Sequence, residues 1–367
     1  MRVILCGGGT AGHVNPAIAI AEEIRRCEPS SSIYFIGRAA GKENRAVKES
    51  GIRLIELNVS GLDRKNPIKC IKAIKQAFDA RQEAKRIIEE KKPDVVIGTG
   101  GYVCWPIISA AQDLGVKTAI HESNVYPGLA TRLLCRDCDL ILLNRKESQK
   151  YITTKGKTVV VGNPLRKDFN TYTRADARRS LGLSDDDLFI LSFGGSIGAK
   201  KMNEVMIDVM NEYSLKDEKI YHIHASGERY FDEARKKANI GSTNRVKITP
   251  YINDMPKMMK AADIVISRSG ASTLSELEAV GAAAILVPSP NVTGNHQLKN
   301  ALLLKNAGAA IVIEEKEMTK EKIIVEISSL KSDKNARKKQ AKNISRFSTK
   351  NCEKRIYEAI KLLTNGK

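Results

Sequence analysis

The stretch "LCGGGTAGHVNPAIAIAEEI", residues 5–24, places a glycine-rich loop between two apolar segments. The apolar run at residues 3–5 is typical of a buried parallel strand, and the loop after it needs the conformational freedom of glycine. Apolar residues then recur at helical spacing, and we expect this helix to begin with Asn15 as its N-cap and Pro16 as its first residue. Strand, loop and helix N-terminus together predict an anion site, because unpaired N–H groups and the positive end of the helix dipole converge there.

The same pattern returns in the second half of the chain. Residues 188–193 are apolar, "GGSIGA" (194–199) is the loop, and apolar residues follow at helical spacing. The stretches "KKPDVVIGTGGY" (91–102) and "KAADIVISRSGAS" (260–272) also echo each other, with an acidic residue, a β-branched run and a glycine turn. This repeat predicts an α/β protein with two Rossmann-like, doubly wound parallel-sheet domains, which bind ligand at the carboxyl ends of their strands.

We place the domain boundary at the Gly-Asn-Pro turn of residues 162–164, which interrupts the pattern. The first domain then spans 1–163 and the second 164–340. The last stretch, about 345–367, is predicted to be helical with one apolar stripe. Two placements remain open for it: a terminal helix of the second domain, or a helix that crosses back onto the first domain.

The charge balance predicts an anionic partner. Lys and Arg number 61 against 42 Asp and Glu, a formal net charge of +19. No nucleic-acid-binding motif is found and aromatic residues are only 5% of the chain, so we expect no nucleic-acid partner. Anionic lipid and a phosphorylated substrate remain. The seven cysteines form no disulfide framework, no signal peptide is found, and every apolar run is shorter than the roughly 20 residues of a membrane-spanning helix. These features predict a cytoplasmic location.

Seven short motifs follow one another along the chain: "GGTAGHVNPAIAIA" (8–21), "GTGGYV" (98–103), "HESN" (121–124), "VGNPLR" (161–166), "GGSIGA" (194–199), "SRSGASTLSE" (267–276) and "NHQLKNA" (295–301). With this set the whole chain resembles glycosyltransferase family 28, the peptidoglycan N-acetylglucosaminyltransferases that act on undecaprenyl-diphospho-muramoyl-pentapeptide. The resemblance implies a GT-B fold, in which two Rossmann-like domains face a cleft. It also implies inverting transfer of N-acetylglucosamine from UDP-N-acetylglucosamine to O4 of the muramoyl sugar (lipid I to lipid II), without a cofactor.

Four residues depart from the family pattern. Ala11 stands where the family commonly has glycine, Cys104 and Trp105 follow "GGYV" in place of small residues, and Ser123 replaces a common glutamine. Because Trp105 is large, we expect it to narrow the acceptor side of the cleft. A glycosyltransferase for another lipid acceptor, or a UDP-sugar epimerase, is therefore the alternative within this fold.

Two other classes of protein are weighed against this interpretation. A nicotinamide-dependent oxidoreductase would need a G-x-G-x-x-G loop followed by an acidic residue about 20 positions on, and the first loop lacks that spacing. A nucleotide-sugar-binding protein without catalysis would keep the donor site and show no transfer.

An inverting transfer needs a base that accepts the proton of the acceptor hydroxyl. His13 is one candidate, because the positive end of the following helix disfavours the imidazolium form and keeps the ring able to accept a proton. Glu122, in "HESN" at the end of a predicted strand, is the other. The sequence does not decide between them. Asn124 is expected to bind sugar hydroxyls, and Tyr102 to line the acceptor pocket.

The donor is expected to be held by both glycine loops and by the helix that "SRSGASTLSE" opens. In this interpretation Glu276 accepts hydrogen bonds from the two ribose hydroxyls, and Arg166 binds the nucleotide or its phosphates. By resemblance alone, Ile252 contacts uracil through its backbone, and Gln297, with His296 beside it, binds the hydroxyls of the donor sugar. The groups expected to bind the diphosphate and the nucleotide are Thr10, Ala11, Gly12, Ser196, Ser269, Gly270, Ala271, Ser272 and Thr273. No D-x-D motif lies where it would hold a metal ion, so we expect none. His222 and His224 alternate along "KIYHIHAS", which indicates a strand rather than a ligand pair.

Residues 62–86 have the pattern of a basic amphipathic helix. Apolar residues recur there every three or four positions, and lysines lie around them: Ile68, Ile71, Ile74 and Phe78, with Lys65, Lys69, Lys72 and Lys75. The stripe either docks on an anionic membrane surface or packs on the sheet as an ordinary crossover helix. If it docks, the protein is peripheral, at the cytoplasmic face of the membrane.

Overall fold

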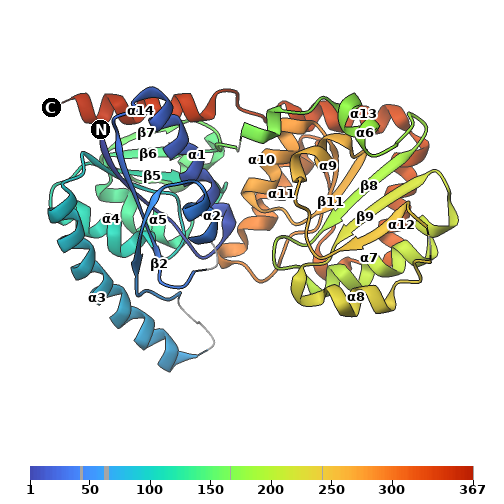
Figure 1. Cartoon of the computed structure of the whole chain (residues 1–367), viewed down its shortest axis with the longest axis horizontal. Coiled ribbons are helices and arrows are strands. Elements are labelled where there is room, and N and C mark those ends of the chain that lie inside the picture. Colours follow the sequence, from blue (N-terminus) through green and yellow to red (C-terminus); the bar gives the residue numbers. More distant parts are fainter. Residues whose placement is uncertain (42–43, 62–65, 166, 242, 367) are drawn as a thin grey trace. The chain divides into compact units, whose positions relative to one another are not determined.

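The computed structural model describes residues 1–41, 44–61, 66–165, 167–241 and 243–366. The chain forms two compact units (Figure 1). The first contains Met1–Arg166 and Thr349–Lys367, and the second is Lys167–Ser348.

Within its described residues, the first unit has a seven-stranded parallel sheet in the order β3-β2-β1-β4-β5-β6-β7. Successive side chains of β1 point to opposite faces, so Ile4 packs under α3, α4 and α5 while Val3 packs under α1 and α14. The strand order reverses between β1 and β4, which is where open parallel sheets of this kind bind ligands. The strands are β1 (Arg2–Cys6), β2 (Ser32–Arg38), β3 (Arg53–Leu57), β4 (Val95–Gly98), β5 (Thr118–Glu122), β6 (Leu140–Leu143) and β7 (Lys157–Val160). The helices are α1 (Ala11–Cys27), α2 (Asn44–Glu49), α3 (Pro67–Lys91), α4 (Cys104–Asp113), α5 (Leu129–Leu134) and α14 (Cys352–Asn365).

Helix α1 begins earlier than the sequence predicts. Its N-cap is Thr10, so Pro16 lies inside the helix and Asn15 is not the cap. The prediction placed proline in the first turn because it lacks an N–H. In the second turn, however, the missing N–H deletes only one backbone bond, to the carbonyl of Gly12, and residues 11–15 take helical angles. His13 is therefore the third residue of the helix rather than a residue before its cap.

Helix α14 packs in the first unit, which is the second of the two placements left open by the sequence. Ile356 and Ile360 are fully buried in the core formed with α1 and the sheet. Glu28, just after α1, accepts a hydrogen bond from Tyr357 at 3.0 Å and also pairs with Lys361. The pairing with Lys361, together with the Met1 ammonium and the Tyr357 hydroxyl, lowers the pKa of Glu28 to about 2.

The second unit repeats the architecture with, in its described part, a six-stranded parallel sheet in the order β10-β9-β8-β11-β12-β13. The two stretches that echo each other in the sequence become β4 and β11, and each pairs with the first strand of its own sheet. Helices α7 and α12 cover one face of the sheet, while α6, α9, α10, α11 and α13 pack on the other. The strands are β8 (Leu188–Phe193), β9 (Ile220–Ala225), β10 (Val246–Thr249), β11 (Ile264–Ser267), β12 (Ala283–Leu286) and β13 (Ile311–Val312). The helices are α6 (Arg174–Ser180), α7 (Lys200–Glu212), α8 (Phe231–Lys237), α9 (Met255–Ala261), α10 (Ala271–Val280), α11 (His296–Asn306), α12 (Lys320–Ser332) and α13 (Lys334–Ser345).

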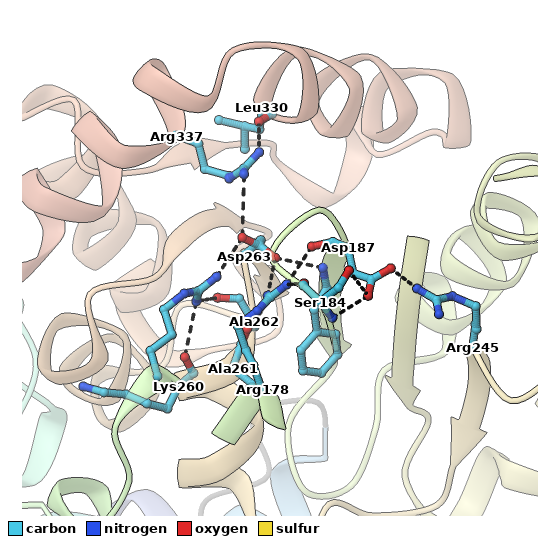
Figure 2. Close-up of polar contacts among 12 residues, drawn as sticks. Arg178, Ser184, Asp187, Arg245, Lys260, Ala261, Ala262, Asp263, Leu330 and Arg337 are labelled. Atoms are coloured by element: carbon cyan, nitrogen blue, oxygen red, sulfur yellow. Dashed lines mark hydrogen bonds and ion pairs between the residues drawn. The ribbon is translucent and has the colours of Figure 1, made fainter. Parts of the chain in front are cut away.

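A charged cluster joins several elements of this unit (Figure 2). The carboxylate of Asp263, just before β11, accepts hydrogen bonds from Arg178 at 2.9 Å, from Arg174 at 2.7 Å and from the backbone N–H of Phe189 at 2.9 Å. Arg337 of α13 lies 3.7 Å from the same carboxylate. Because the cluster lies at the amino ends of β8 and β11, away from the glycine loops, it serves to fasten α6 and α13 to the sheet.

Candidate functional site

The two glycine loops of the first unit meet where the sheet order reverses. The N–H of Gly8 donates to the carbonyl of Gly100 at 3.3 Å, and the Thr99 hydroxyl donates to the carbonyl of His13 at 2.6 Å. Gly100 and Gly101 both have positive φ. A Cβ on Gly100 would lie 2.7 Å from Cδ2 of His13, and one on Gly101 would lie 2.1 Å from the carbonyl oxygen of Gly8. Only glycine therefore lets "GTGGYV" lie flush against the first loop.

The His13 ring has a defined orientation in this contact. Its Nδ1 lies 3.0 Å from the carbonyl oxygen of Gly8 and 3.2 Å from the hydroxyl of Thr10. A carbonyl oxygen can only accept, so Nδ1 carries the proton of the neutral ring and Nε2 is its acceptor nitrogen. His13 is half-buried at the first turn of α1. A histidine in this state can take a proton from a hydroxyl placed against Nε2.

Glu122, the other candidate base, is buried at the end of β5 and bonded to its own loop. One carboxylate oxygen accepts from the backbone N–H of Asn124 at 2.9 Å and from its side-chain amide at 3.0 Å. The other accepts from the N–H of Gly128 at 2.9 Å and from the Thr131 hydroxyl at 2.6 Å. Four donors on one carboxylate fix the loop between β5 and α5.

The rest of "HESN" is tied to the Gly-Asn-Pro turn. His121 Nε2 lies 2.9 Å from the carbonyl oxygen of Gly162, and the Ser123 hydroxyl donates to the Asn163 side chain at 3.1 Å. Complete burial lowers the pKa of His121, so this ring is held neutral. Ser123, which stands where the family commonly has glutamine, thus supplies the hydroxyl that bonds to Asn163.

The remaining predicted residues of the first unit lie around the two loops. The Tyr102 ring lies beside Gly9 and Gly61, since a Cβ on either glycine would come within 3.1 Å of it. Thr10 is exposed at the N-cap of α1, and Ala11 and Gly12 are the first two helical residues. Arg166 lies outside the described residues.

In the second unit, the loop "GGSIGA" lies between β8 and the N-terminus of α7. Gly195 and Gly198 have positive φ, and Ser196 between them is exposed. A Cβ on Gly198 would lie 2.0 Å from the carbonyl oxygen of Ser226, at the end of β9. The loop is thus pressed against the neighbouring strand end, with its serine outward.

The N-termini of α10 and α11 are joined by hydrogen bonds. The Ser269 hydroxyl is fully buried and donates to the carbonyl of Gln297 at 2.9 Å. The side-chain oxygen of Gln297 accepts from the N–H of Ser289 at 2.9 Å, which leaves its amide nitrogen as the remaining donor of the side chain. Ser269, predicted as a ligand contact, therefore uses its side chain to hold the loop.

The other predicted donor residues sit on the same helices. Gly270 is the N-cap of α10, residues 271–273 form its first turn, and Glu276 lies three residues after Thr273 on the same side of the helix. His296 opens α11, with Nδ1 2.9 Å from the carbonyl oxygen of Thr293. The Ile252 side chain is buried in the core, which leaves its backbone as the group available to a ligand.

Arg268 also holds this region together, although its sequence position predicts no role for it. Its guanidinium donates to the carbonyls of Val287 at 3.1 Å and Pro288 at 3.4 Å, and it pairs with Glu315. It therefore ties the start of the α10 loop to the loop after β12.

Helix α3 presents its apolar stripe to solvent. Ile68 and Ile71 are 80% and 70% exposed, and Ile74 and Phe78 are 46% and 53% exposed. The buried side of the helix is formed by other residues: Ala73, Ala80, Ala84, Ile87 and Ile88. The N-terminal part of the predicted segment, residues 62–65 with Lys65, lies outside the described residues. Among the described residues, no helix combines the length and the apolar character that crossing a membrane requires.

Trp105 lies in α4, where it contacts α3. Its ring packs edge-to-face against Phe78, with ring centroids 5.4 Å apart. Trp105 is half-buried and belongs to the core beneath α3 and α4. The ring therefore borders the exposed stripe.

Two Rossmann-like units, each with a glycine loop and helix N-termini at the carboxyl ends of its strands, define a nucleotide-binding α/β protein with two such domains. Residues 3–142 match the model of the glycosyltransferase family 28 N-terminal domain, and residues 189–356 match that of the family 28 C-terminal domain. The chain belongs to glycosyltransferase family 28, and the resemblance carried by the seven motifs is confirmed.

Similar proteins match this chain along nearly its full length. A protein of Acetivibrio thermocellus named UDP-N-acetylglucosamine--N-acetylmuramyl-(pentapeptide) pyrophosphoryl-undecaprenol N-acetylglucosamine transferase is 40% identical, over 100% of this chain and 99% of its own. The crystal structure of Acinetobacter baumannii MurG has a TM-score of 0.77 at 26% identity, covering 98% and 99% of the two chains, and it confirms the predicted GT-B fold. The UDP-GlcNAc 2-epimerase of Neisseria meningitidis has a TM-score of 0.66 at 13% identity, covering 98% and 99%, and shows the fold alone.

Proposed function

We propose that this protein transfers N-acetylglucosamine from UDP-N-acetylglucosamine to O4 of the muramoyl sugar of undecaprenyl-diphospho-muramoyl-pentapeptide, with inversion at the anomeric carbon. The full-length similarity to transferases named for these substrates supports the choice of reaction. The observation that carries it on this chain is the His13 ring, which is fixed by Gly8 with Nε2 as its acceptor nitrogen.

His13 is the base in this mechanism. The muramoyl O4 hydroxyl donates its hydrogen bond to Nε2, and the proton passes to the ring as O4 attacks the anomeric carbon. The Nδ1–H bond to the Gly8 carbonyl persists in both charge states, because that nitrogen is a donor in each. Glu122 acts through the loop it holds, and Asn124 of that loop binds the acceptor sugar.

The second unit receives the donor. The N–H groups of the loop at residues 194–199 and of the first turn of α10 bind the diphosphate. As the bond to the sugar breaks, negative charge grows on the leaving UDP, and these fixed dipoles stabilise it. Glu276 accepts from the ribose hydroxyls, the backbone of Ile252 contacts uracil, and His296 and Gln297 bind the sugar hydroxyls. Arg166 is assigned to the nucleotide phosphates.

Helix α3 is the membrane-docking surface in this proposal, which places the protein at the cytoplasmic face of the membrane as a peripheral protein. The exposed fractions of its isoleucines support this assignment, because leaving Ile68 or Ile71 in water forfeits about 2 kcal/mol of transfer free energy for each side chain. Exposed Lys72 and Lys75 add about 1 kcal/mol each near an anionic surface. Docking would bring the His13 site to a substrate that resides in the membrane.

The first experiment measures UDP release from UDP-N-acetylglucosamine with and without a short-chain lipid-linked muramoyl-pentapeptide. We expect release only with acceptor, and a disaccharide product. His13→Gln should lower kcat by about 100-fold or more with little change in the Kd of UDP. Glu122→Gln, which keeps an acceptor oxygen, should lose less activity than His13→Gln. Equal rates with and without acceptor, or conversion of the donor to its C2 epimer, would overturn the proposal.

The membrane assignment has a direct reporter, because Trp105 is the only tryptophan of the chain and it contacts Phe78. Vesicles containing anionic lipid should shift its fluorescence to shorter wavelength and pull the protein down on sedimentation. Replacing Ile68 and Ile71 with serine should abolish both effects. The matched control, Val325→Ser, changes another exposed apolar residue, on α12, and should leave binding unchanged. Equal binding by both variants would refute the assignment.

A further inference from the structure

Five polar side chains form a continuous hydrogen-bonded chain inside the second unit. They come from β8, β9, α7 and the turn after α7, and each is at most 4% exposed: Ser214, His222, Ser192, His224 and Asn203. The successive distances are 2.8 Å, 2.9 Å, 2.8 Å and 3.0 Å. The chain ends where the Asn203 side-chain amide donates to the carbonyl of Ser226 at 2.9 Å.

The backbone carbonyl at this end sets the direction of every bond. A carbonyl can only accept, so Asn203 presents its NH₂ group to Ser226 and its oxygen to His224. His224 must then donate from Nε2 and accept at Nδ1 from the Ser192 hydroxyl. That hydroxyl in turn accepts from Nε2 of His222. Ser214 donates to the remaining nitrogen of His222, and no proton is missing or in excess along the chain.

This order requires both imidazoles to be neutral, and their surroundings enforce it. Burial lowers the pKa of His222 to about 3 and that of His224 to about 4. The side chains bonded to the two rings are the hydroxyls of Ser214 and Ser192 and the amide of Asn203, which carry no charge. The arrangement is therefore constant at neutral pH.

The carbonyl that Asn203 holds is also the support of the second glycine loop. The Cα of Gly198 lies so close to it that a Cβ there would come within 2.0 Å of the Ser226 oxygen. Gly227, the next residue, is equally close to the loop, since a Cβ on it would lie 2.6 Å from the nitrogen of Gly198. A shift of the Ser226–Gly227 turn therefore moves the loop N–H groups.

We propose that Asn203, oriented by His224, is a positioning residue for the loop at residues 194–199. Through Asn203, the hydrogen-bonded side chains set the affinity of the loop for the diphosphate of the nucleotide sugar. The inference rests on the proposed function, which places the diphosphate at this loop. Neither side chain touches the ligand. Their effect passes through the carbonyl of Ser226.

The test uses the full-length protein and measures the Kd of UDP by titration calorimetry, with KM for both substrates and Tm for each variant. His224→Leu removes the donor to Asn203 and is expected to raise the Kd of UDP and the KM of the donor about tenfold, which corresponds to about 1.4 kcal/mol. The KM of the lipid acceptor should not change. His224→Gln restores an N–H at the position of Nε2 and should recover most of the affinity. Ser214→Ala, at the far end of the chain, should lower Tm and leave the Kd of UDP unchanged.

Unchanged UDP affinity in His224→Leu, or an equal loss of affinity in Ser214→Ala, would overturn the inference. Either result would mean that the hydrogen-bonded side chains stabilise the fold and do not position the loop. If His224→Leu does not fold, Asn203→Asp is used, since it keeps the shape but sets an oxygen against the carbonyl of Ser226. Wild-type affinity for UDP in that variant would equally refute the positioning role. A wild-type protein that binds no UDP would instead refute the proposed function.

Discussion

Removing the carboxylate of Asp263 is expected to destabilise the second unit by about 3 kcal/mol. The side chains of Asp263 and Arg178 are only 9% and 8% exposed, and breaking a buried ion pair by deleting one partner costs about 3–5 kcal/mol. The lower end applies because Arg178 also donates to the carbonyls of Ala261, Ser184 and Asp187, which remain in Asp263→Ala. For a unit of this size the loss corresponds to a fall in Tm of roughly 6–12 °C.

Urea unfolding of the full chain, followed by a probe of the second unit, measures this loss. The matched control is Glu233→Ala, which breaks an exposed pair with Lys237 on α8 and should leave the free energy of unfolding nearly unchanged, because solvent screens such pairs. Arg178→Met in the Asp263→Ala background should recover part of the stability, because it removes the buried charge left alone. If Asp263→Ala costs no more than Glu233→Ala, the electrostatic account of the cluster in Figure 2 is refuted.

Three further predictions concern the buried histidines, the glycine loops of the first unit and helix α14. Because burial lowers the pKa of His222 and His224 in the folded protein, the unfolded chain takes up protons first as the pH falls. The free energy of unfolding should therefore be constant above about pH 6.5 and fall by about 2 kcal/mol per histidine by pH 5. Denaturant titrations at each pH measure this dependence, and His224→Gln should remove about half of it. Gly101→Ala should abolish transfer in the UDP-release assay while UDP binding persists, whereas Gly115→Ala, at a positive φ with open space around it, should keep its activity. Ile360→Ala should destabilise the first unit by about 2–4 kcal/mol in urea titrations, and normal stability would contradict the packing of α14.

The sequence predicted the repeated strands and loops because their periodicity is local. The apolar runs at β1 and β8 stand directly before glycines, and β4 and β11 carry the same short pattern. The predicted start of α1 was wrong because proline is preferred in the first turn of a helix, where its missing N–H costs least, but it is not confined to that turn. In this chain the helix extends one turn further toward the loop, to Ala11.

The roles of polar residues were harder to predict than their places. Glu122 lies at the end of a strand, as predicted, and donors from the segment that follows hold its carboxylate. The carbonyl that Ser269 contacts belongs to Gln297, 28 residues further along the chain, and no local spacing reveals that contact. The placement of α14 was open for the same reason. Its apolar stripe required a partner, and only the three-dimensional structure identifies that partner as α1 and its sheet.

The return of α14 to the first unit has a consequence for how the protein is made. The ribosome must add the whole of Lys167–Ser348 before α14 exists, which takes roughly 10 to 40 seconds at about 5–20 residues per second. During that time the sheet face that Ile356 and Ile360 later cover stays open, while the second unit can already complete its own core. The half of the enzyme that is translated first is thus the half that matures last, and chaperones that bind apolar surface have their opportunity in that interval.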